Sequence, residues 1–167
     1  VDAGGDKEEG EAYITNWLKT FPLEKETQFL IVSWLDAGGD KQVVEQYLLQ
    51  WLQKYPEEKE VSFVIKSWLD NAGGKEVVEE YLIRWLCKYP EEKEVSFVIS
   101  AWLDAGGAKI TIESHMIRWL NKFPEEVETD FLIVAWLNAG GHKETVEESL
   151  LKWLKRYPLE MEVSFVI

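Results

Sequence analysis

The sequence predicts an all-α protein made of tandem helix–turn–helix repeats, because three features recur at fixed spacings. Tryptophan recurs at every seventeenth position, at Trp17, Trp34, Trp51, Trp68, Trp85, Trp102, Trp119, Trp136 and Trp153. An aromatic–proline pair recurs at twice that interval, with its prolines at Pro22, Pro56, Pro90, Pro124 and Pro158. A Gly-Gly pair falls near the middle of each interval, at Gly4-Gly5, Gly38-Gly39, Gly73-Gly74, Gly106-Gly107 and Gly140-Gly141. The chain is therefore built from a 34-residue unit that contains two tryptophans, and it holds about five such units.

Each half of the unit has the spacing of an amphipathic helix. In residues 61–69 and again in residues 78–86, apolar side chains stand at i, i+3, i+4, i+7 and i+8. This spacing places them on one wide stripe of a helix, whereas the alternation typical of a strand is absent. Each unit is therefore predicted to hold two helices that bury one face each.

The residues between these segments are typical of helix ends. The Gly-Gly pair follows the first helix, where glycine takes the left-handed conformation that closes a helix. The aromatic–proline pair ends the second helix, and we expect the proline to occupy the first turn of the next helix. Acidic residues such as Glu57 and Glu58 follow the proline and Lys54 precedes it, which complements the helix dipole on both sides.

The third unit has a different turn. It contains Asp70-Asn71-Ala72-Gly73-Gly74-Lys75 where the second contains Asp36-Ala37-Gly38-Gly39-Asp40-Lys41. We interpret the difference as one residue gained before the glycines and one lost after them, so that the length of the unit is unchanged.

The core is expected to be strongly aromatic. Besides the nine tryptophans, a phenylalanine follows each proline at a constant distance, at Phe29, Phe63, Phe97, Phe131 and Phe165. A single helical hairpin could not bury so many large apolar groups, so neighbouring units are expected to cover them.

Composition excludes several classes of protein. The formal net charge is −13, from 31 acidic and 18 basic residues, which opposes nonspecific binding to nucleic acid or to an anionic membrane. The single cysteine, Cys87, allows no intramolecular disulfide and favours a reducing compartment. No leader segment and no membrane-length apolar run is present, so we expect a cytoplasmic protein without a membrane span.

The unit resembles the tetratricopeptide repeat, which is also a helical hairpin of about 34 residues. In that family a Gly-Asp pair stands half a repeat before the proline that follows the second helix, as Gly39-Asp40 stands before Pro56 here. The alignment covers nearly the whole chain. The chain departs from the family at positions that usually hold small residues. In the second helix, one of these positions is occupied by Val44, Val78, Ile112 and Val146, and another, further along, by Trp51, Trp85, Trp119 and Trp153. In the first helix, the usual glycine is replaced by Val32, Lys66, Ser100 and Val134.

A second family with units of the same length, the repeats of TAL-effector DNA-binding proteins, also places Gly-Gly-Lys between two helices. Gly73-Gly74-Lys75 is similar to that motif. The prolines fall elsewhere and the composition is acidic, so this interpretation is less favoured than the tetratricopeptide-like one.

No group of residues predicts catalysis. His115 stands where other units have tyrosine or serine, and His142 follows a Gly-Gly pair, which predicts an exposed loop residue. Cys87 aligns with polar residues and is expected to be partly exposed. Zinc ligands usually come in closely spaced pairs, which are absent here, and no phosphate-binding loop, nucleophile elbow or HExxH motif occurs. We therefore predict a protein that is not an enzyme and has no cofactor or metal.

The candidate binding residues are those that vary from unit to unit while the frame stays constant. They lie six and three positions before each proline: Asn16, Lys19, Gln50, Gln53, Arg84, Cys87, Arg118, Asn121, Lys152 and Lys155. Residues three apart are neighbours on a helix, so these form a polar ladder across successive second helices. The alternative is a solvated helix face with cations near its end.

Taken together, the sequence predicts a right-handed α-solenoid of about five repeats, with residues 1–167 as one array. We expect a noncatalytic scaffold that binds a protein or peptide along its concave face; by analogy such folds bind partners. The alternatives are a structural element that assembles end to end and, less favoured, an array that binds nucleic acid. The partner, the biological process and a natural or designed origin stay open.

The chain ends fall inside predicted helices. Residues 1–5 match residues 35–39, the end of a first helix, and Ile167 matches Ile65, before the tryptophan of a first helix. We therefore expect an excerpt of a longer array, with apolar stripes uncovered at both ends. Copies are expected to stack head to tail, the segment 159–167 of one packing near residues 8–20 of the next.

Overall fold

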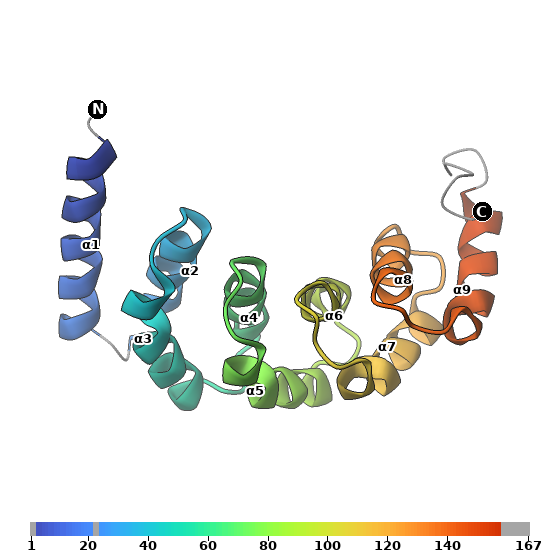
Figure 1. Cartoon of the computed structure of the whole chain (residues 1–167). Coiled ribbons are helices and arrows are strands. Elements are labelled where there is room, and N and C mark those ends of the chain that lie inside the picture. Colours follow the sequence, from blue (N-terminus) through green and yellow to red (C-terminus); the bar gives the residue numbers. More distant parts are fainter. Residues whose placement is uncertain (1–2, 22–23, 158–167) are drawn as a thin grey trace. The chain divides into compact units, whose positions relative to one another are not determined.

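The computed structural model describes residues 3–21 and 24–157 of the 167-residue chain, and side chains from residue 9 onward. This described part is all helical and contains no strand, as predicted (Figure 1). Its helices are α1 (Ala3–Thr20), α2 (Thr27–Asp36), α3 (Lys41–Lys54), α4 (Val61–Asp70), α5 (Lys75–Lys88), α6 (Glu94–Asp104), α7 (Lys109–Lys122), α8 (Glu128–Asn138) and α9 (Lys143–Arg156). None of these described helices has the length and apolar character needed to cross a membrane.

The chain forms two compact units. The first covers Val1–Trp85, in which α2 packs against α1, α3 and α4. The second covers Leu86–Ile167, in which α6 packs against α7 and α8, and α9 packs against α7 and α8. Helix α5 contains the boundary between them. We call α2, α4, α6 and α8 the first helices, and α1, α3, α5, α7 and α9 the second helices.

The five tryptophans expected in the core are buried. Trp51, Trp68, Trp85, Trp102 and Trp119 expose at most 2% of their surface. For Trp51 and Trp119 the described aromatic neighbour differs from the expectation, because it is the residue that caps the end of the same helix rather than one in an adjoining helix. The ring centroids of Trp51 and Tyr55 are 5.3 Å apart, and those of Trp119 and Phe123 are 5.1 Å apart.

The tryptophans of the first helices hold the short turn that follows them. Each indole Nε1 donates at 2.9 Å to the carbonyl six positions later, as in Trp34 to Asp40, Trp68 to Gly74, Trp102 to Ala108 and Trp136 to His142. The glycine five positions after each of these tryptophans lies against the ring, and a Cβ on Gly107 would lie 2.2 Å from Cε2 of Trp102. Only glycine fits between the turn and the indole at this position.

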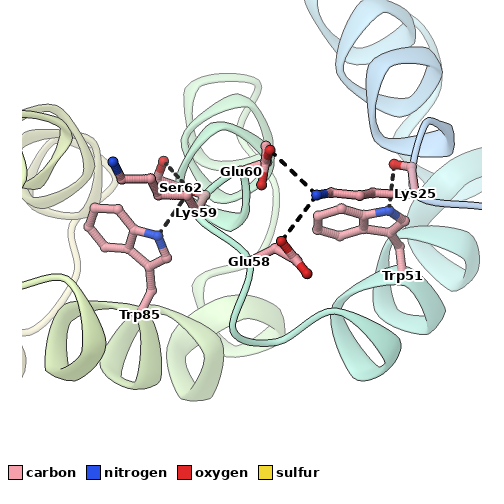
Figure 2. Close-up of polar contacts among 7 residues, drawn as sticks. All are labelled: Lys25, Trp51, Glu58, Lys59, Glu60, Ser62 and Trp85. Atoms are coloured by element: carbon pink, nitrogen blue, oxygen red, sulfur yellow. Dashed lines mark hydrogen bonds and ion pairs between the residues drawn. The ribbon is translucent and has the colours of Figure 1, made fainter.

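The tryptophans of the second helices hold the longer turn that precedes the first helix of the same repeat. Nε1 donates to a turn carbonyl 26 or 27 positions earlier, as in Trp51 to Lys25 (3.0 Å), Trp85 to Lys59 (3.0 Å), Trp119 to Glu92 (2.9 Å) and Trp153 to Glu126 (3.0 Å). Figure 2 shows Trp51 and Trp85 reaching two such turns. Nζ of Lys25 lies 3.1 Å from a carboxylate oxygen of Glu58 and 3.7 Å from one of Glu60, and these ion pairs link one turn to the next. The hydrogen bond to Glu58 raises the pKa of Lys25.

These turns correct the expected place of the prolines. Helix α4 begins at Val61, well after Pro56, and α6 begins at Glu94, well after Pro90, so neither proline occupies the first turn of a helix. Between proline and helix the backbone remains non-helical and offers its carbonyls to the tryptophan indoles. The cations predicted at the ends of the second helices are present, as in α3 and α7, whose last turns hold Lys54 and Lys122.

The turn of the third unit contains no inserted or deleted residue, so the interpretation of a gain and a loss was wrong. Gly73 lies on the ring of Trp68 as Gly39 lies on Trp34, and the carbonyl of Gly74 accepts the indole N–H as that of Asp40 does. Ala72 therefore occupies the left-handed position of the first glycine, with a φ of 62°. In the other described turns this position is held by Gly38, Gly106 and Gly140, with φ values of 83°, 80° and 82°.

The expectation for the first Gly-Gly pair was also wrong. Gly4 and Gly5 lie inside α1 rather than in a turn.

The phenylalanines expected in the core lie at the surface instead. Phe29, Phe63, Phe97 and Phe131 are 65%, 54%, 38% and 56% exposed, and Phe165 lies outside the described residues. In α4, Val61, Ile65 and Trp68 define the buried face. At about 100° per residue, Phe63 lies about 200° around the helix from Val61 and so faces away from the core.

Replacing Trp85 with alanine is expected to lower the free energy of unfolding by about 3–5 kcal/mol, because it empties a buried site and removes the hydrogen bond from the indole to the Lys59 carbonyl. Denaturant unfolding measures the change. A loss below about 0.5 kcal/mol would contradict the assignment of Trp85 to the core.

Replacing Ala72 with glycine is expected to stabilise the chain by about 1 kcal/mol, because the left-handed backbone disfavours a Cβ. Replacing the adjacent Gly73 with alanine is the opposite control, since its Cβ would lie 2.2 Å from Trp68. Thermal unfolding should show opposite shifts for the two variants; shifts of the same sign would refute the assignment of these two positions.

Candidate functional site

The structure places the predicted polar ladder at the surface of the second helices. Asn16 and Lys19 lie in α1, Gln50 and Gln53 in α3, and Arg84 in α5, within the first unit. In the second unit the set continues with Cys87, Arg118, Asn121, Lys152 and Lys155. All ten side chains are exposed except that of Gln50, which is half-buried. Asn16 and Lys19 also border a shallow depression on α1.

Two members of the ladder have partners within the chain. The side chain of Gln53 is hydrogen-bonded to the hydroxyl of Tyr81, which is 8% exposed. Burial and the charge of Glu80 raise the pKa of Tyr81, while this bond opposes the shift. Lys152 forms an ion pair with Glu148 one turn earlier, at 3.1 Å. These contacts fit the alternative given for the ladder, a solvated helix face.

The histidines and the cysteine lie in separate elements. His115 is half-buried in α7, and burial together with the charge of Arg118 lowers its pKa. His142 is exposed in the turn before α9, and Cys87 is exposed in α5, both as expected. Among the residues that the structure describes, no three His, Cys, Asp or Glu side chains come close enough to hold a metal ion.

The exposed surface of the first helices forms a more regular pattern. In α4 the side chains from Val61 to Leu69 are buried except Phe63 and Lys66. Phe63 and Asp70 are exposed and Lys66 between them is half-buried, in positions i, i+3 and i+7. We call such a triplet a first-helix stripe. The four described stripes are Phe29–Val32–Asp36, Phe63–Lys66–Asp70, Phe97–Ser100–Asp104 and Phe131–Val134–Asn138.

Neighbouring stripes lie side by side within each unit. In the first unit α2 packs against α4, and Oδ1 of Asp36 accepts hydrogen bonds from Ser67 Oγ (2.9 Å) and Asn71 Nδ2 (3.1 Å) of the next first helix. In the second unit α6 packs against α8. Each pair therefore presents two exposed phenylalanines on adjacent helices, with a side chain that differs between them in the middle of the stripe.

The far end of the stripes carries negative charge. Asp36, Asp70 and Asp104 stand in the last turns of α2, α4 and α6, and none of these turns holds a basic residue. The carbonyl end of a helix is itself partly negative, so these carboxylates add to the dipole instead of offsetting it. The second helices show the opposite arrangement, with lysine or arginine in their last turns. Lys66 pairs with Asp70 in the same stripe.

The stripe of α8 is the most apolar of the four. Val127, one turn before Phe131, is 55% exposed and stands where the other units have Lys25, Lys59 and Lys93. Asn138 replaces the aspartate at its far end. The second unit therefore offers the larger apolar surface, through Val127 and Phe131 beside Phe97 of α6.

Asp130 differs from its counterparts in this region. It stands where two other units have Ser62 and Ser96, whose hydroxyls donate to the carbonyls of Lys59 and Lys93 at 3.1 and 2.9 Å. Oδ1 of Asp130 is buried and has no hydrogen-bond partner. Burial raises the pKa of Asp130, and the charge of Glu128 adds to the shift against the opposing backbone N–H bonds.

With this geometry established, comparison with known proteins shows no matching family model, no matching curated protein and no matching solved structure. The sequence analysis did not predict the first-helix stripes, because it assigned every large aromatic residue to the core. The signal is nevertheless present in the sequence, since the phenylalanines are out of phase with the Val–Ile–Trp stripe of the same helices.

Replacing Asp130 with serine is expected to raise the free energy of unfolding by about 0.5–1.5 kcal/mol at neutral pH, because serine can donate to the turn carbonyl. The pKa of Asp130 is raised by folding, so protonation favours the folded state and ionisation disfavours it. The advantage of serine should therefore be full above the folded pKa and shrink as the pH falls toward the unfolded value.

Denaturant titrations at several pH values measure this difference. Ser96→Asp is the matched control, since it places the same carboxylate in the equivalent position of α6 and should destabilise with the same pH profile. An effect of Asp130→Ser that is independent of pH would show that the carboxylate charge is not the cause.

Proposed function

We propose that this protein is a noncatalytic, tetratricopeptide-like α-solenoid, right-handed and with about five repeats, that binds a protein or peptide across the exposed face of its first helices. The 34-residue period of helices and turns supports the solenoid. The four regularly placed, exposed phenylalanines support the binding surface and carry the proposal. The single cysteine, free and exposed, supports a cytoplasmic setting.

Single exposed apolar residues are ordinary on protein surfaces, but a repeated row of them marks an interaction surface. Here α4 buries nearly all of its length, and each described first helix leaves a phenylalanine outside, at the same position every time. Aromatic side chains are effective anchors because they offer a large apolar area with few rotatable bonds. The phenylalanines would provide affinity, and the variable middle position would select among partners.

The charges of the stripes suggest the chemistry of the partner. The net charge is −13, and carboxylates stand at the carbonyl ends of α2, α4 and α6. A basic side chain would be attracted there, whereas an acidic peptide or a nucleic acid backbone would be repelled. Phenylalanine and aspartate of one stripe are two helical turns apart, or about 10 Å along the helix. The partner is therefore an apolar and basic segment with these two features about 10 Å apart.

The test is a peptide-display selection on the purified chain, followed by fluorescence anisotropy with the synthesised peptides. Selected peptides should combine apolar residues with lysine or arginine. Phe97→Ala with Phe131→Ala should weaken their binding about 30-fold to 1,000-fold, because each of the two aromatic anchors contributes on the order of 1–2 kcal/mol.

The matched control replaces Lys152 and Lys155, two exposed members of the polar ladder in the same unit, with alanine. This variant should bind the peptides as the unmodified chain does. Loss of binding in the control but not in the phenylalanine variant would move the site to the second helices, and a selection that returns acidic peptides would overturn the proposed partner.

A further inference from the structure

Helix α7 has an apolar outer face. Ile110 in its first turn is 85% exposed, which is more than any other large apolar side chain among the described residues. Ser114 and Ile117 follow at i+4 and i+7, so they lie on the same side of the helix, and both are exposed. We call Ile110, Ser114, Ile117 and the adjacent Arg118 the α7 face.

The second helices α3, α5 and α9 are polar at the first two of these positions. Glutamine or glutamate replaces both Ile110 and Ser114 there, at Gln42, Gln46, Glu76, Glu80, Glu144 and Glu148. The buried side of α7 keeps the common pattern, with Ile112, Met116 and Trp119 in the core. The change in α7 is therefore confined to its exposed side, where packing of the core does not require it.

The α7 face is basic near its end. Arg118 is exposed, whereas Glu113, the one acidic residue of the helix, is half-buried. Ile110 and Arg118 are eight positions apart, or about 12 Å along the helix. The α7 face thus combines an apolar group and a basic group at close to the spacing inferred above for the partner of the first-helix stripes.

The α6 stripe has the complementary arrangement. Phe97 is 38% exposed, and Asp104 is exposed in a last turn that holds no basic residue. These two residues are seven positions apart, or about 10 Å along the helix. Ser100 between them is small, as Ser114 is in the α7 face, so the two helices can approach closely.

The other described stripes fit the α7 face less well. The carboxylate of Asp36 in α2 already accepts two hydrogen bonds from the next repeat. In α4, Asp70 is paired with Lys66, and in α8 Asn138 replaces the carboxylate. No side chain of the described residues pairs with Asp104, so the α6 stripe offers the available carboxylate.

We propose that the partner of the α6 stripe is a second copy of this chain, which docks by its α7 face; this inference rests on the function proposed above. Phe97 of one copy packs on Ile110 of the other, and Asp104 pairs with Arg118. Both surfaces change from apolar to charged toward the carboxyl end of their helix, so the two helices run in the same direction. Within one copy α6 and α7 pack against each other, so the two surfaces are different faces of the unit and the contact propagates from copy to copy.

The contact is expected to be weak and sensitive to salt. One helix packed on another buries less surface than a stable dimer requires, which is typical of transient association. An ion pair between exposed groups is also screened by salt. The head-to-tail stacking expected from the sequence is a different contact, and its segment 159–167 lies outside the described residues.

The experiment is sedimentation velocity of the full chain at low salt over a concentration series. The unmodified chain should gain mass as its concentration rises. Ile110→Glu should weaken association at least about 10-fold, because its carboxylate would face Phe97 and Asp104. Gln42→Glu is the matched control, since it places the same carboxylate at the equivalent exposed position of α3, and it should leave association unchanged. Neither variant should shift the thermal unfolding of the dilute chain, because Glu144 occupies the same position in α9.

A charge exchange tests the ion pair. Asp104→Arg and Arg118→Asp should each weaken association about fivefold, because like charges then meet across the contact. The chain that carries both changes should associate as the unmodified chain does, since opposite charges meet again. A double variant that associates no better than the single variants would overturn the proposed pairing.

Anisotropy with the selected peptides separates this inference from the function on which it rests. Ile110→Glu should bind those peptides as the unmodified chain does, whereas Phe97→Ala should weaken both peptide binding and self-association. A chain that binds the peptides but stays monomeric at every concentration would overturn the second copy as the partner and leave the first-helix site in place. Association that survives Ile110→Glu, or that is lost in Gln42→Glu, would also overturn it.

Discussion

The hydrogen bond from a buried indole N–H to a turn carbonyl is the interaction on which the rest of this structure depends. One tryptophan of each repeat holds the short turn after its own helix, and the other holds the longer turn before the first helix. The turn carbonyls lie outside any helix and need a donor, and the indoles need an acceptor once their rings are buried. Both needs are met by one contact, which explains why glycine lies against the ring and why the chain stays non-helical after the proline.

This arrangement leaves the first helices with very little free surface. Packing on the neighbouring helices and the tryptophan contacts bury most of α4, so that a change at most of its positions would disturb the core. Phe63 and Asp70 are released from this constraint and Lys66 between them is only half-buried, and the equivalent positions of the other described first helices follow the same pattern. A function that varies between repeats without cost to the fold is therefore best placed on these stripes. The second helices have a wider exposed face, on which Gln53 and Lys152 already have partners within the chain.

A few residues differ from their equivalents in the other repeats, either in residue type or in hydrogen bonding. Ala72 accepts a left-handed backbone because the Trp68 contact with Gly73 and Gly74 keeps the turn in place. Asp130 places a carboxylate where a hydroxyl would donate, and its neighbour Phe131 remains exposed beside Val127. Departures of this kind persist when the surrounding contacts are strong enough to impose the geometry. Nε1 of Trp17, which is buried without a hydrogen-bond partner, belongs to the same group, since its equivalents in the other described repeats donate to a turn carbonyl.

The sequence by itself determined the helices, their 34-residue period and the burial of the tryptophans, because helical periodicity and the turn residues are local properties of the chain. It did not determine which aromatic residues are buried. The aromatic character of Phe63 predicts that it lies in the core, but Val61 and Trp68 define the buried face of the helix and Phe63 lies on the opposite face. The in-register turn of the third unit and the non-helical segment after Pro56 also emerged only in three dimensions. Their cause is a contact between residues far apart in the chain, such as Trp85 with Lys59, and spacing alone does not reveal which carbonyl a buried indole will reach.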